Sequence, residues 1–340
     1  MLLFSSSRDN KISLILPLEE KIFFLSNSCM IKAEIKDQEL LSHIDGLEKD
    51  GMSIFVMADG QFRGALFHGT RFVNQMRANH NLGILETMIL GQACLCGALM
   101  IPTMKGKERL RLRYDTNGPA AGFSVESDST GYVRGCLFQD RIPVEKPLES
   151  WDLAPFFGPG TVSVTRFPEG RTEPMTGTVE IKHRNIAKDL AWYFLQSEQI
   201  NTAFNTSIQL DKKGRVTGAG GLFIQTMPGA DDEVIQRVEM AFGASPSYGQ
   251  WFSEKGSRED IIYGLFREFN PSVALERDVI FDCPCSKDVF ESHILNLDRK
   301  ELEEIIETNP DEPVETVCHY CGSVYRIDKN ELKAKMNKKN

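Results

Sequence analysis

Four cysteines near the C-terminus have the residue type and spacing that point most directly to chemistry. They form two close pairs, Cys283 with Cys285 and Cys318 with Cys321, and Gly322 follows the second pair. In a C-x-x-C-G turn the backbone curls so that both sulfurs point at one centre, and the glycine permits the positive φ needed there. Two cysteine pairs without a nearby cluster of carboxylates or histidines favour one Zn²⁺ per chain, bound tetrahedrally by four thiolates.

Two helix-start signals accompany the cysteines. Asp298 with Glu301 three residues later resembles a capping box, and Asp328 with Glu331 repeats the arrangement before a last helix. A module of this size buries little apolar surface by itself. Metal ligation, worth ~10–16 kcal/mol in small zinc domains, would therefore supply most of its folding stability.

The spacing leaves two roles open for this site. Zinc ribbons usually have C-x-x-C on both sides, whereas only Pro284 separates Cys283 from Cys285. Closely held thiolates are also the form that oxidants attack. If each pair oxidises internally, four ligands are lost at once and the module loses its main source of stability. Spacing alone supports a static site and a redox switch about equally, with the static site slightly ahead because most four-cysteine zinc sites are structural.

The bulk composition is that of a soluble globular protein. The chain has 340 residues, of which 41% are hydrophobic and 26% charged, and this length suffices for two domains. The net charge of −9 argues against a nucleic-acid surface, which needs clustered Lys and Arg. Eight cysteines are too few for a secreted disulfide scaffold, so we expect a reducing, cytoplasmic location.

Neither apolar stretch of the chain predicts a membrane segment. Residues 87–104 contain no charge and approach spanning length, but Gln92, Pro102 and two glycines dilute them, so we predict a buried core helix. The N-terminal apolar runs are interrupted by Pro17 and charged residues and do not resemble a secretory signal. Residues 1–29 have weak periodicity and are predicted to be an N-terminal extension, with Met30 as an alternative start.

Short apolar runs separated by turn signals predict an α+β core with antiparallel strands, because the turns are too short for βαβ crossovers. After Pro228, residues 231–242 and 258–269 predict amphipathic helices with too little apolar surface to be stable alone. The predicted strands are 53–57, 64–67, 109–114, 121–126, 133–138, 161–167 and 176–181, and the predicted core helices are 84–100 and 185–197.

The cysteine pattern resembles that of the heat-shock protein 33 family, the redox-regulated holdase chaperones. Ser286 after the first pair and Tyr325 after the second are similar to the family's C-x-C-S and C-x-x-C elements. The SEQ-x-x-T stretch at 197–202 and the glycine-rich segment at 218–221 resemble parts of its core domain, and residues 265–268 resemble its linker motif. The likeness covers most of the chain.

The resemblance spans residues 30–331 and implies a fold. That fold is α+β, with a mostly antiparallel β core domain and packed helices, a metastable helical linker and a small C-terminal four-cysteine zinc domain. The expected parts are an N-terminal extension (1–29), the core domain (30–228), the linker (229–282) and a zinc-binding redox-switch domain (283–340).

The resemblance also implies a function. It is that of an ATP-independent chaperone that binds unfolding proteins under oxidative stress, zinc-bound and inactive when reduced. Oxidation would form Cys283–Cys285 and Cys318–Cys321 disulfides, release zinc, unfold the linker and favour a homodimer that captures clients. The alternative is a static zinc-ribbon interaction module. A thiol-disulfide oxidoreductase is disfavoured because no βαβ context surrounds the C-x-x-C pair.

The other four cysteines are predicted to have no functional role. Cys94 and Cys96 form a second C-x-C pair, but inside the apolar helix, where residues two apart lie on different faces, so they are expected in the core. Cys29 and Cys136 are expected to be equally inert.

Two further polar residues have ordinary structural explanations. His319 is expected to be a solvent-facing turn residue, and Glu198 to make a structural hydrogen bond at a helix end. No G-x-S-x-G, phosphate-loop or dinucleotide motif is present. We therefore expect a protein that is not an enzyme.

Overall fold

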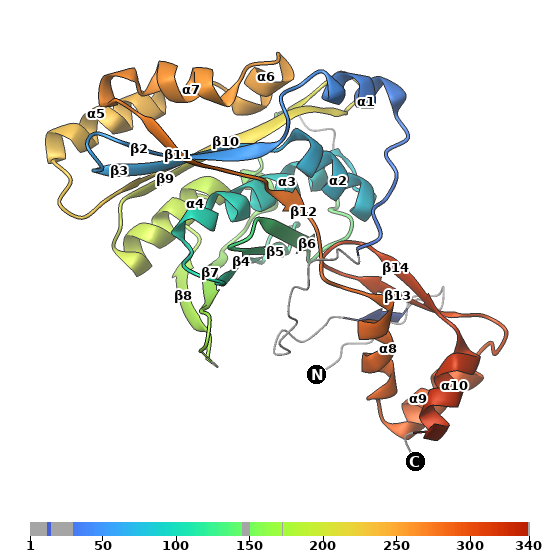
Figure 1. Cartoon of the computed structure of the whole chain (residues 1–340). Helices are drawn as coiled ribbons and strands as arrows, with labels where there is room; N and C mark the ends of the chain where they lie inside the picture. The colour runs from blue at the N-terminus through green and yellow to red at the C-terminus, as the bar shows by residue number, and fades with distance from the viewer. Residues whose placement is uncertain (1–11, 15–29, 145–149, 172, 339–340) are drawn as a thin grey trace. The chain divides into compact units, whose positions relative to one another are not determined.

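The computed structural model describes residues 12–14, 30–144, 150–171 and 173–338 (Figure 1). Contacts divide the chain into two units. The larger unit comprises Glu34–Ala78 and Leu82–Phe281. The smaller one, which we call the cysteine unit, comprises the described parts of Met1–Ala33, Asn79–Asn81 and Asp282–Asn340.

A five-stranded antiparallel sheet forms one layer of the larger unit, in the order β11-β2-β3-β10-β9. A tight turn joins β2 to β3, and Asp59 and Gly60 adopt positive φ there, as the sharp reversal requires. The register places Met57 opposite Phe62 and buries both. The strands are β2 (Gly51–Met57), β3 (Phe62–His68), β9 (Thr202–Leu210), β10 (Val216–Thr226) and β11 (Ser272–Arg277).

A six-stranded sheet forms the second layer, in the order β12-β6-β5-β4-β7-β8. All neighbours are antiparallel except β12, which runs parallel to β6. On β4, Leu110, Leu112 and Tyr114 alternate inward, so this face of the sheet is apolar. The strands are β4 (Arg109–Thr116), β5 (Gly122–Asp128), β6 (Tyr132–Leu137), β7 (Gly160–Phe167), β8 (Met175–Glu180) and β12 (Ile280–Phe281).

Helix α3 (Ile84–Leu99) lies between the two sheets and contacts strands of both. The segment Ile84–Thr103 is long and apolar enough to cross a membrane by composition alone, yet 83% of its most apolar window is buried in this unit. The predicted core helix is therefore confirmed. The other helices of this part of the chain are α1 (Gln38–Asp45), which contacts β10, α2 (Thr70–His80) and α4 (Ile186–Tyr193), which contacts α3.

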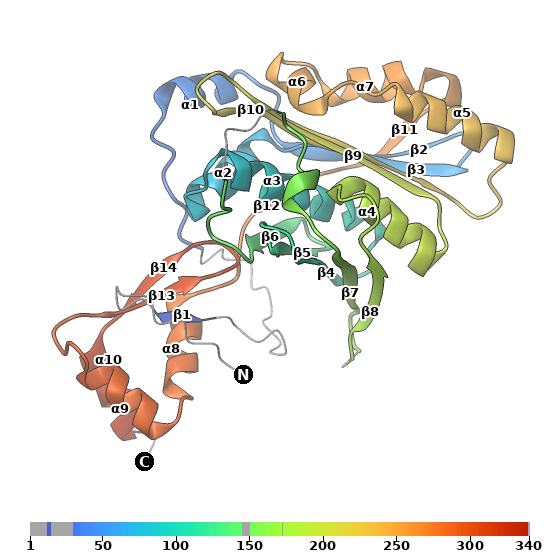
Figure 2. The ribbon, with the colours of Figure 1, turned by 180° about the vertical axis from the view of Figure 1, so that it is seen from behind.

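Three short helices cover the outer face of the five-stranded sheet, opposite α3 (Figure 2). They are α5 (Asp232–Gly243), α6 (Tyr248–Ser253) and α7 (Arg258–Leu265). Phe252 and Phe266 are fully buried against sheet residues such as Phe55 and Leu66. None of these helices is long enough to be stable in isolation, so the sheet provides the surface that keeps them folded.

The cysteine unit has a three-stranded sheet in the order β1-β13-β14. Strands β13 (Val314–Cys318) and β14 (Val324–Ile327) form an antiparallel hairpin, and β1 (Ile12–Leu14) pairs with β13 in parallel. Three helices complete the described residues of the unit: α8 (Lys287–Leu295), α9 (Arg299–Glu307) and α10 (Lys329–Lys338).

Both predicted cap residues stand at a helix start, but only one of the two side chains makes the predicted hydrogen bonds. Asp328 accepts hydrogen bonds from the Asn330 and Glu331 amides at 2.8 and 3.0 Å, as predicted. Asp298 stands at the N-cap of α9 but its side chain makes no capping hydrogen bond. The D-x-x-E pattern still marks the start of α9, and the helix buries Leu302 and Ile306 on its apolar face.

The predicted α+β class with antiparallel strands is confirmed, and every predicted strand and helix is present to within a few residues. Strands β1 and β9 to β14 and helices α1, α2, α6 and α8 were not predicted. Residues 229–281 group with the larger unit by contacts, so a separate linker domain stays a prediction. Of the predicted extension 1–29, only Ile12–Leu14 is described.

Candidate metal centre

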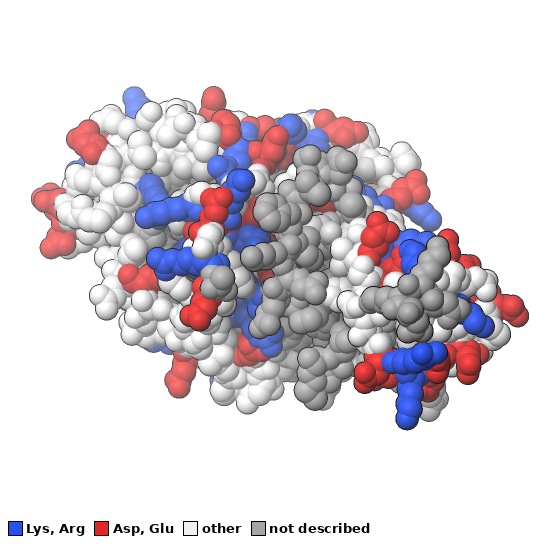
Figure 3. Space-filling model, turned by 60° about the horizontal axis from the view of Figure 1, so that its bottom comes forward, with Lys and Arg blue, Asp and Glu red and all other residues white. Residues whose placement is uncertain are grey.

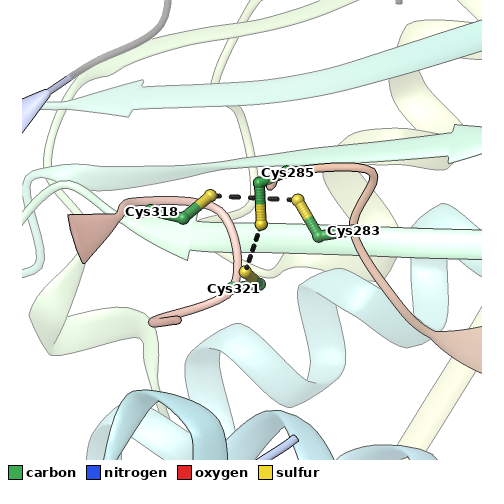
Figure 4. A group of neighbouring side chains, drawn as sticks. All are labelled: Cys283, Cys285, Cys318 and Cys321. Atoms are coloured by element: carbon green, nitrogen blue, oxygen red, sulfur yellow. Dashed lines mark hydrogen bonds between the residues drawn. The ribbon is translucent and has the colours of Figure 1, made fainter. Parts of the chain in front are cut away.

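Two segments of the cysteine unit bring the four predicted ligand sulfurs together (Figure 4). Cys283 and Cys285 lie in the stretch between β12 and α8, and Cys318 and Cys321 flank the turn between β13 and β14. All four Sγ atoms lie within 4.8 Å of one another. The Sγ atoms of Cys283 and Cys318 are 3.8 Å apart and those of Cys285 and Cys321 are 3.3 Å apart. All four side chains are buried.

The turn that carries the second pair has the geometry that the C-x-x-C-G motif predicts. The Cys318 carbonyl accepts hydrogen bonds from the amides of Cys321 at 3.3 Å and Gly322 at 2.7 Å. Gly322 has φ +69°, which side chains other than glycine rarely adopt. The Ser323 carbonyl accepts from the Cys318 amide at 2.9 Å and closes the hairpin. The role predicted for the glycine is confirmed.

Polar neighbours hold the sulfurs in place. The Tyr325 hydroxyl lies 3.2 Å from Cys285 Sγ and donates to the Cys285 carbonyl at 2.9 Å. The Tyr325 ring lies 5.3 Å from that of Phe290, which comes from α8. Cys321 Sγ lies 3.2 Å from Ser323 Oγ. These contacts fix the ligand rotamers from outside the sulfur cluster.

Two of these neighbours were not identified from the sequence alone. Tyr325 entered only as part of a resemblance, and nothing in the spacing marked Ser323. Asn79, which groups with this unit, donates from Nδ2 to the Cys321 carbonyl at 3.0 Å although it is 242 residues away in sequence. A single sequence carries no local signal for a hydrogen bond of that range.

The arrangement fits a tetrahedral four-thiolate metal site. With Zn–S bonds of about 2.3 Å, the sulfurs of a regular tetrahedron are about 3.8 Å apart, close to the distances found here. Contact with Cys283 raises the pKa of the Cys285, Cys318 and Cys321 thiols, and burial raises it further. Four buried sulfurs at this spacing cannot all be anionic unless a cation lies among them, and an all-sulfur donor set selects a thiophilic ion.

The other candidate residues lie elsewhere, as predicted. Cys94 and Cys96 are buried on α3, and Cys136 is buried on β6. Burial raises the pKa of the Cys96 and Cys136 thiols to about 12. In the described ranges the four clustered cysteines are the only group of three or more His, Cys, Asp or Glu side chains placed to hold a metal. Cys29 lies outside the described residues.

The two polar residues with predicted structural roles are also placed. Glu198 ends a π-helical turn after α4 and pairs with Arg166 of β7 at 2.9 Å, so the predicted structural bond is confirmed. His319 lies in the turn between two of the cysteines and is partly exposed.

Comparisons with known proteins agree with this geometry. The family model described as "Hsp33 protein" matches residues 50–328. The chain is 32% identical over 278 residues to the 33 kDa chaperonin of Shouchella clausii, which covers 81% of this chain and 93% of the relative. It is 30% identical over 295 residues to the 33 kDa chaperonin of Aquifex aeolicus, covering 85% of this chain and 90% of that one.

The fold is likewise similar to a solved structure. The crystal structure of the 33 kDa chaperonin, a heat shock protein 33 homologue, from Thermotoga maritima superposes with a TM-score of 0.76 at 28% sequence identity. The match covers 86% of this chain and 99% of that chain. Since the family model, the relatives and the fold all agree over most of the chain, this protein belongs to the Hsp33 family of chaperones.

Proposed function

We propose that this protein is an ATP-independent holdase whose client binding is switched on by oxidation of Cys283, Cys285, Cys318 and Cys321. The observation that carries the proposal is the burial of four sulfurs within 4.8 Å of one another, with no other metal-ligand side chain in the cluster. Such a group can bind a metal or form disulfides, but not both at once. A static zinc ribbon would use only the first of these properties.

In the reduced state the four cysteines are the ligands of one Zn²⁺ ion per chain. The bound ion keeps the thiolates deprotonated and provides most of the folding free energy of this small unit. The chain's own part is to orient the ligands: the turn at Gly322 aims Cys318 and Cys321, and Tyr325 fixes Cys285. The linker then stays folded and the protein is inactive.

Oxidation removes the ligands in pairs. Two thiolates, two protons and one hydrogen peroxide give one disulfide and two waters, so two equivalents of peroxide oxidise all four cysteines. We propose Cys283–Cys285 and Cys318–Cys321 as the disulfides. Two close sulfur contacts in the structure join Cys283 to Cys318 at 3.8 Å and Cys285 to Cys321 at 3.3 Å, across the two pairs. Since all four sulfurs lie within 4.8 Å, the geometry permits both pairings, and peptide mapping of the oxidised protein decides between them.

The linker is the part that responds. Cys283 follows β12 and Asp282 directly, so the cysteine unit and residues 229–281 are consecutive in the chain. The helices α5 to α7 are short and depend on packing for stability. When the cysteine unit unfolds we expect them to leave the sheet and to expose buried side chains such as Phe252 and Phe266. On α5, Met240 is already 69% exposed. Unfolded clients bind such apolar surface.

The remaining assignments follow from this mechanism. We propose that the working parts are residues 30–228, 229–282 and 283–340, that the clients are unfolded or partly unfolded proteins, and that the oxidised form is a homodimer. The protein then acts in the cytoplasm, where thiols are reduced until stress. It acts by binding, without catalysis, and neither nucleic acid nor membrane is a partner. Basic and acidic side chains are interspersed on the face shown in Figure 3, in keeping with a net charge of −9.

A direct test is a light-scattering assay with a chemically denatured client. Reduced, zinc-loaded protein should leave aggregation nearly unchanged, and the same sample treated with peroxide under mild heat, or with hypochlorite, should suppress it while releasing about one zinc per chain. Equal suppression by the reduced, zinc-loaded protein would contradict the switch. Retention of zinc under oxidant would favour the static zinc module instead.

A further inference from the structure

The third strand of the cysteine unit comes from the opposite end of the chain. Strand β1 pairs in parallel with β13, and the register places Ile12 opposite Thr316, Ser13 opposite Val317 and Leu14 opposite Cys318. Strand β13 is thereby the central strand of the sheet, with β14 on its other side. We propose that β1 is a strap that stabilises the reduced cysteine hairpin and slows its oxidation.

The stabilising effect follows from the number of strands. A two-stranded hairpin such as β13–β14 is marginally stable in water by itself, whereas a third strand satisfies the open edge of β13. The paired stretch ends opposite Cys318, so β1 supports β13 up to the residue that carries one of the four sulfurs. A segment that binds the folded hairpin but not the unfolded one shifts the equilibrium toward the folded form.

A second contact reaches the other cysteine of the same turn. The Ile31 amide donates to Ser323 Oγ at 3.1 Å, and Ser323 Oγ donates to the Ile31 carbonyl at 3.3 Å. Ser323 Oγ also lies 3.2 Å from Cys321 Sγ. The N-terminal part of the chain therefore meets the hairpin at two points, one beside Cys318 and one beside Cys321.

Oxidation of these cysteines must bring their sulfurs closer together, and we expect the hairpin to open as the sulfurs move. Because the strap opposes that opening, removing it should raise the rate of cysteine oxidation. The expected increase is on the order of tenfold, since the net contribution of one or two backbone hydrogen bonds is lost. This inference rests on the proposed redox switch for its functional meaning, but the strand pairing is measurable without it.

The first arm of the test uses amide hydrogen exchange on the reduced full-length protein and on a variant lacking residues 2–29, which keeps Ile31. The amides of Thr316–Cys318 should exchange roughly tenfold faster in the truncated protein, while those of β4 and β5 in the larger unit stay unchanged. Unchanged exchange at Thr316–Cys318 would overturn the strap, whatever the chaperone assay shows.

The second arm measures the rate of thiol loss and of zinc release under a fixed peroxide concentration. Ser13→Pro and Leu14→Pro form a matched pair, because successive amides of a strand point to opposite sides and only one of the two faces β13. The variant whose lost amide faces β13 should oxidise as fast as the truncated protein. The other variant should oxidise at close to the wild-type rate. If the amides of β13 exchange faster but the cysteines oxidise at an unchanged rate, the regulatory role is overturned and β1 has a structural role only.

Discussion

The chain contains two Cys-x-Cys pairs, and the two pairs lie in opposite environments. Cys94 and Cys96 are on α3, where the helix turns successive sulfurs to different faces and packing encloses each one separately. Cys283 and Cys285 lie in an irregular stretch before α8, and their sulfurs converge on a second pair. The same motif gives inert core residues in one backbone and a ligand set in the other.

The contrast extends to the two units that carry the pairs. The larger unit is held by two sheets around an apolar helix and by aromatic side chains between sheet and linker. The cysteine unit has a three-stranded sheet and three short helices, so a metal has to supply what its small core does not. The two units should therefore fail for different reasons, and variants can separate these reasons.

The largest effect is expected from removing one ligand. Cys285→Ser should reduce bound zinc from about one per chain to near zero and unfold the cysteine unit, because most of the ~10–16 kcal/mol of ligation is lost. Zinc content by mass spectrometry and a calorimetric melt measure both effects. Cys96→Ala is the matched control from the other pair: it should keep the zinc and cost about 1 kcal/mol in the larger unit. Zinc loss in the control would contradict the comparison.

Acid should also act on the larger unit, through a buried histidine. His68 is fully buried, stacks on Phe252 of α6 at 4.2 Å, and its Nδ1 has no hydrogen-bond partner. Burial, together with the positive charges of Arg258 and Arg71, lowers the pKa of His68 to about 3. The folded pKa is below the ordinary 6.5, so stability is retained above pH 6.5 and lost as the pH falls from 6.5 toward 3. At pH 4.5 the loss is about 3 kcal/mol.

A variant is needed to isolate this effect, because a second buried group titrates with the opposite sign. Burial raises the pKa of Asp50 to about 6, which favours folding as the pH falls. His68→Gln should remove the histidine contribution, so the wild type should lose more stability than the variant between pH 7 and pH 4.5 in urea melts. Equal losses in the two proteins would show that His68 is protonated without cost.

The packing of α6 on the five-stranded sheet gives the next prediction. A Cβ added to Gly218 of β10 would lie 1.9 Å from the Gly249 carbonyl and 2.6 Å from the Ser253 amide, both on α6. Gly218→Ala should therefore displace α6 at a cost of about 2 kcal/mol and give partial holdase activity without oxidant. Gly264→Ala, where a Cβ meets no atom within 4 Å, is the control and should stay inactive when reduced. If neither variant is active without oxidant, displacing α6 does not activate the protein, and this prediction is wrong.

The smallest effect distinguishes the two caps of the cysteine unit. Asp328→Ala removes two capping hydrogen bonds and should cost about 1 kcal/mol, whereas Asp298→Ala removes none and should change stability by a few tenths. Thermal melts of the zinc-loaded proteins measure the difference. A larger cost at Asp298 would show that the cap forms in solution.

The sequence predicted the site better than it predicted the sheet on which the linker helices pack. The C-x-x-C-G turn is a local motif, so the convergence of Cys318 and Cys321 and the positive φ of Gly322 followed from adjacent residues. Strand β10 was not predicted because residues 218–221 are rich in glycine, which weakens a strand signal. In the structure these glycines let α6 approach the sheet, a tertiary reason that no local pattern carries.

The same limit applies to the cysteine unit. Strand β1 is three residues long and pairs with a strand about 300 residues away, so its pairing depends on a contact that local propensity does not encode. The contacts of Ser323 and Asn79 are equally non-local in origin. Ligand identity is local chemistry, whereas the support of the ligands is tertiary structure.

The central claim is that oxidation of the four cysteines unfolds the cysteine unit and the linker helices but leaves the core domain folded. Hydrogen exchange across the whole chain, before and after peroxide, measures this directly. We predict loss of amide protection in residues 282–331 and in α5 to α7, with protection retained in β4, β5 and α3. Unchanged protection in α5 to α7 after complete oxidation and zinc release would contradict the account.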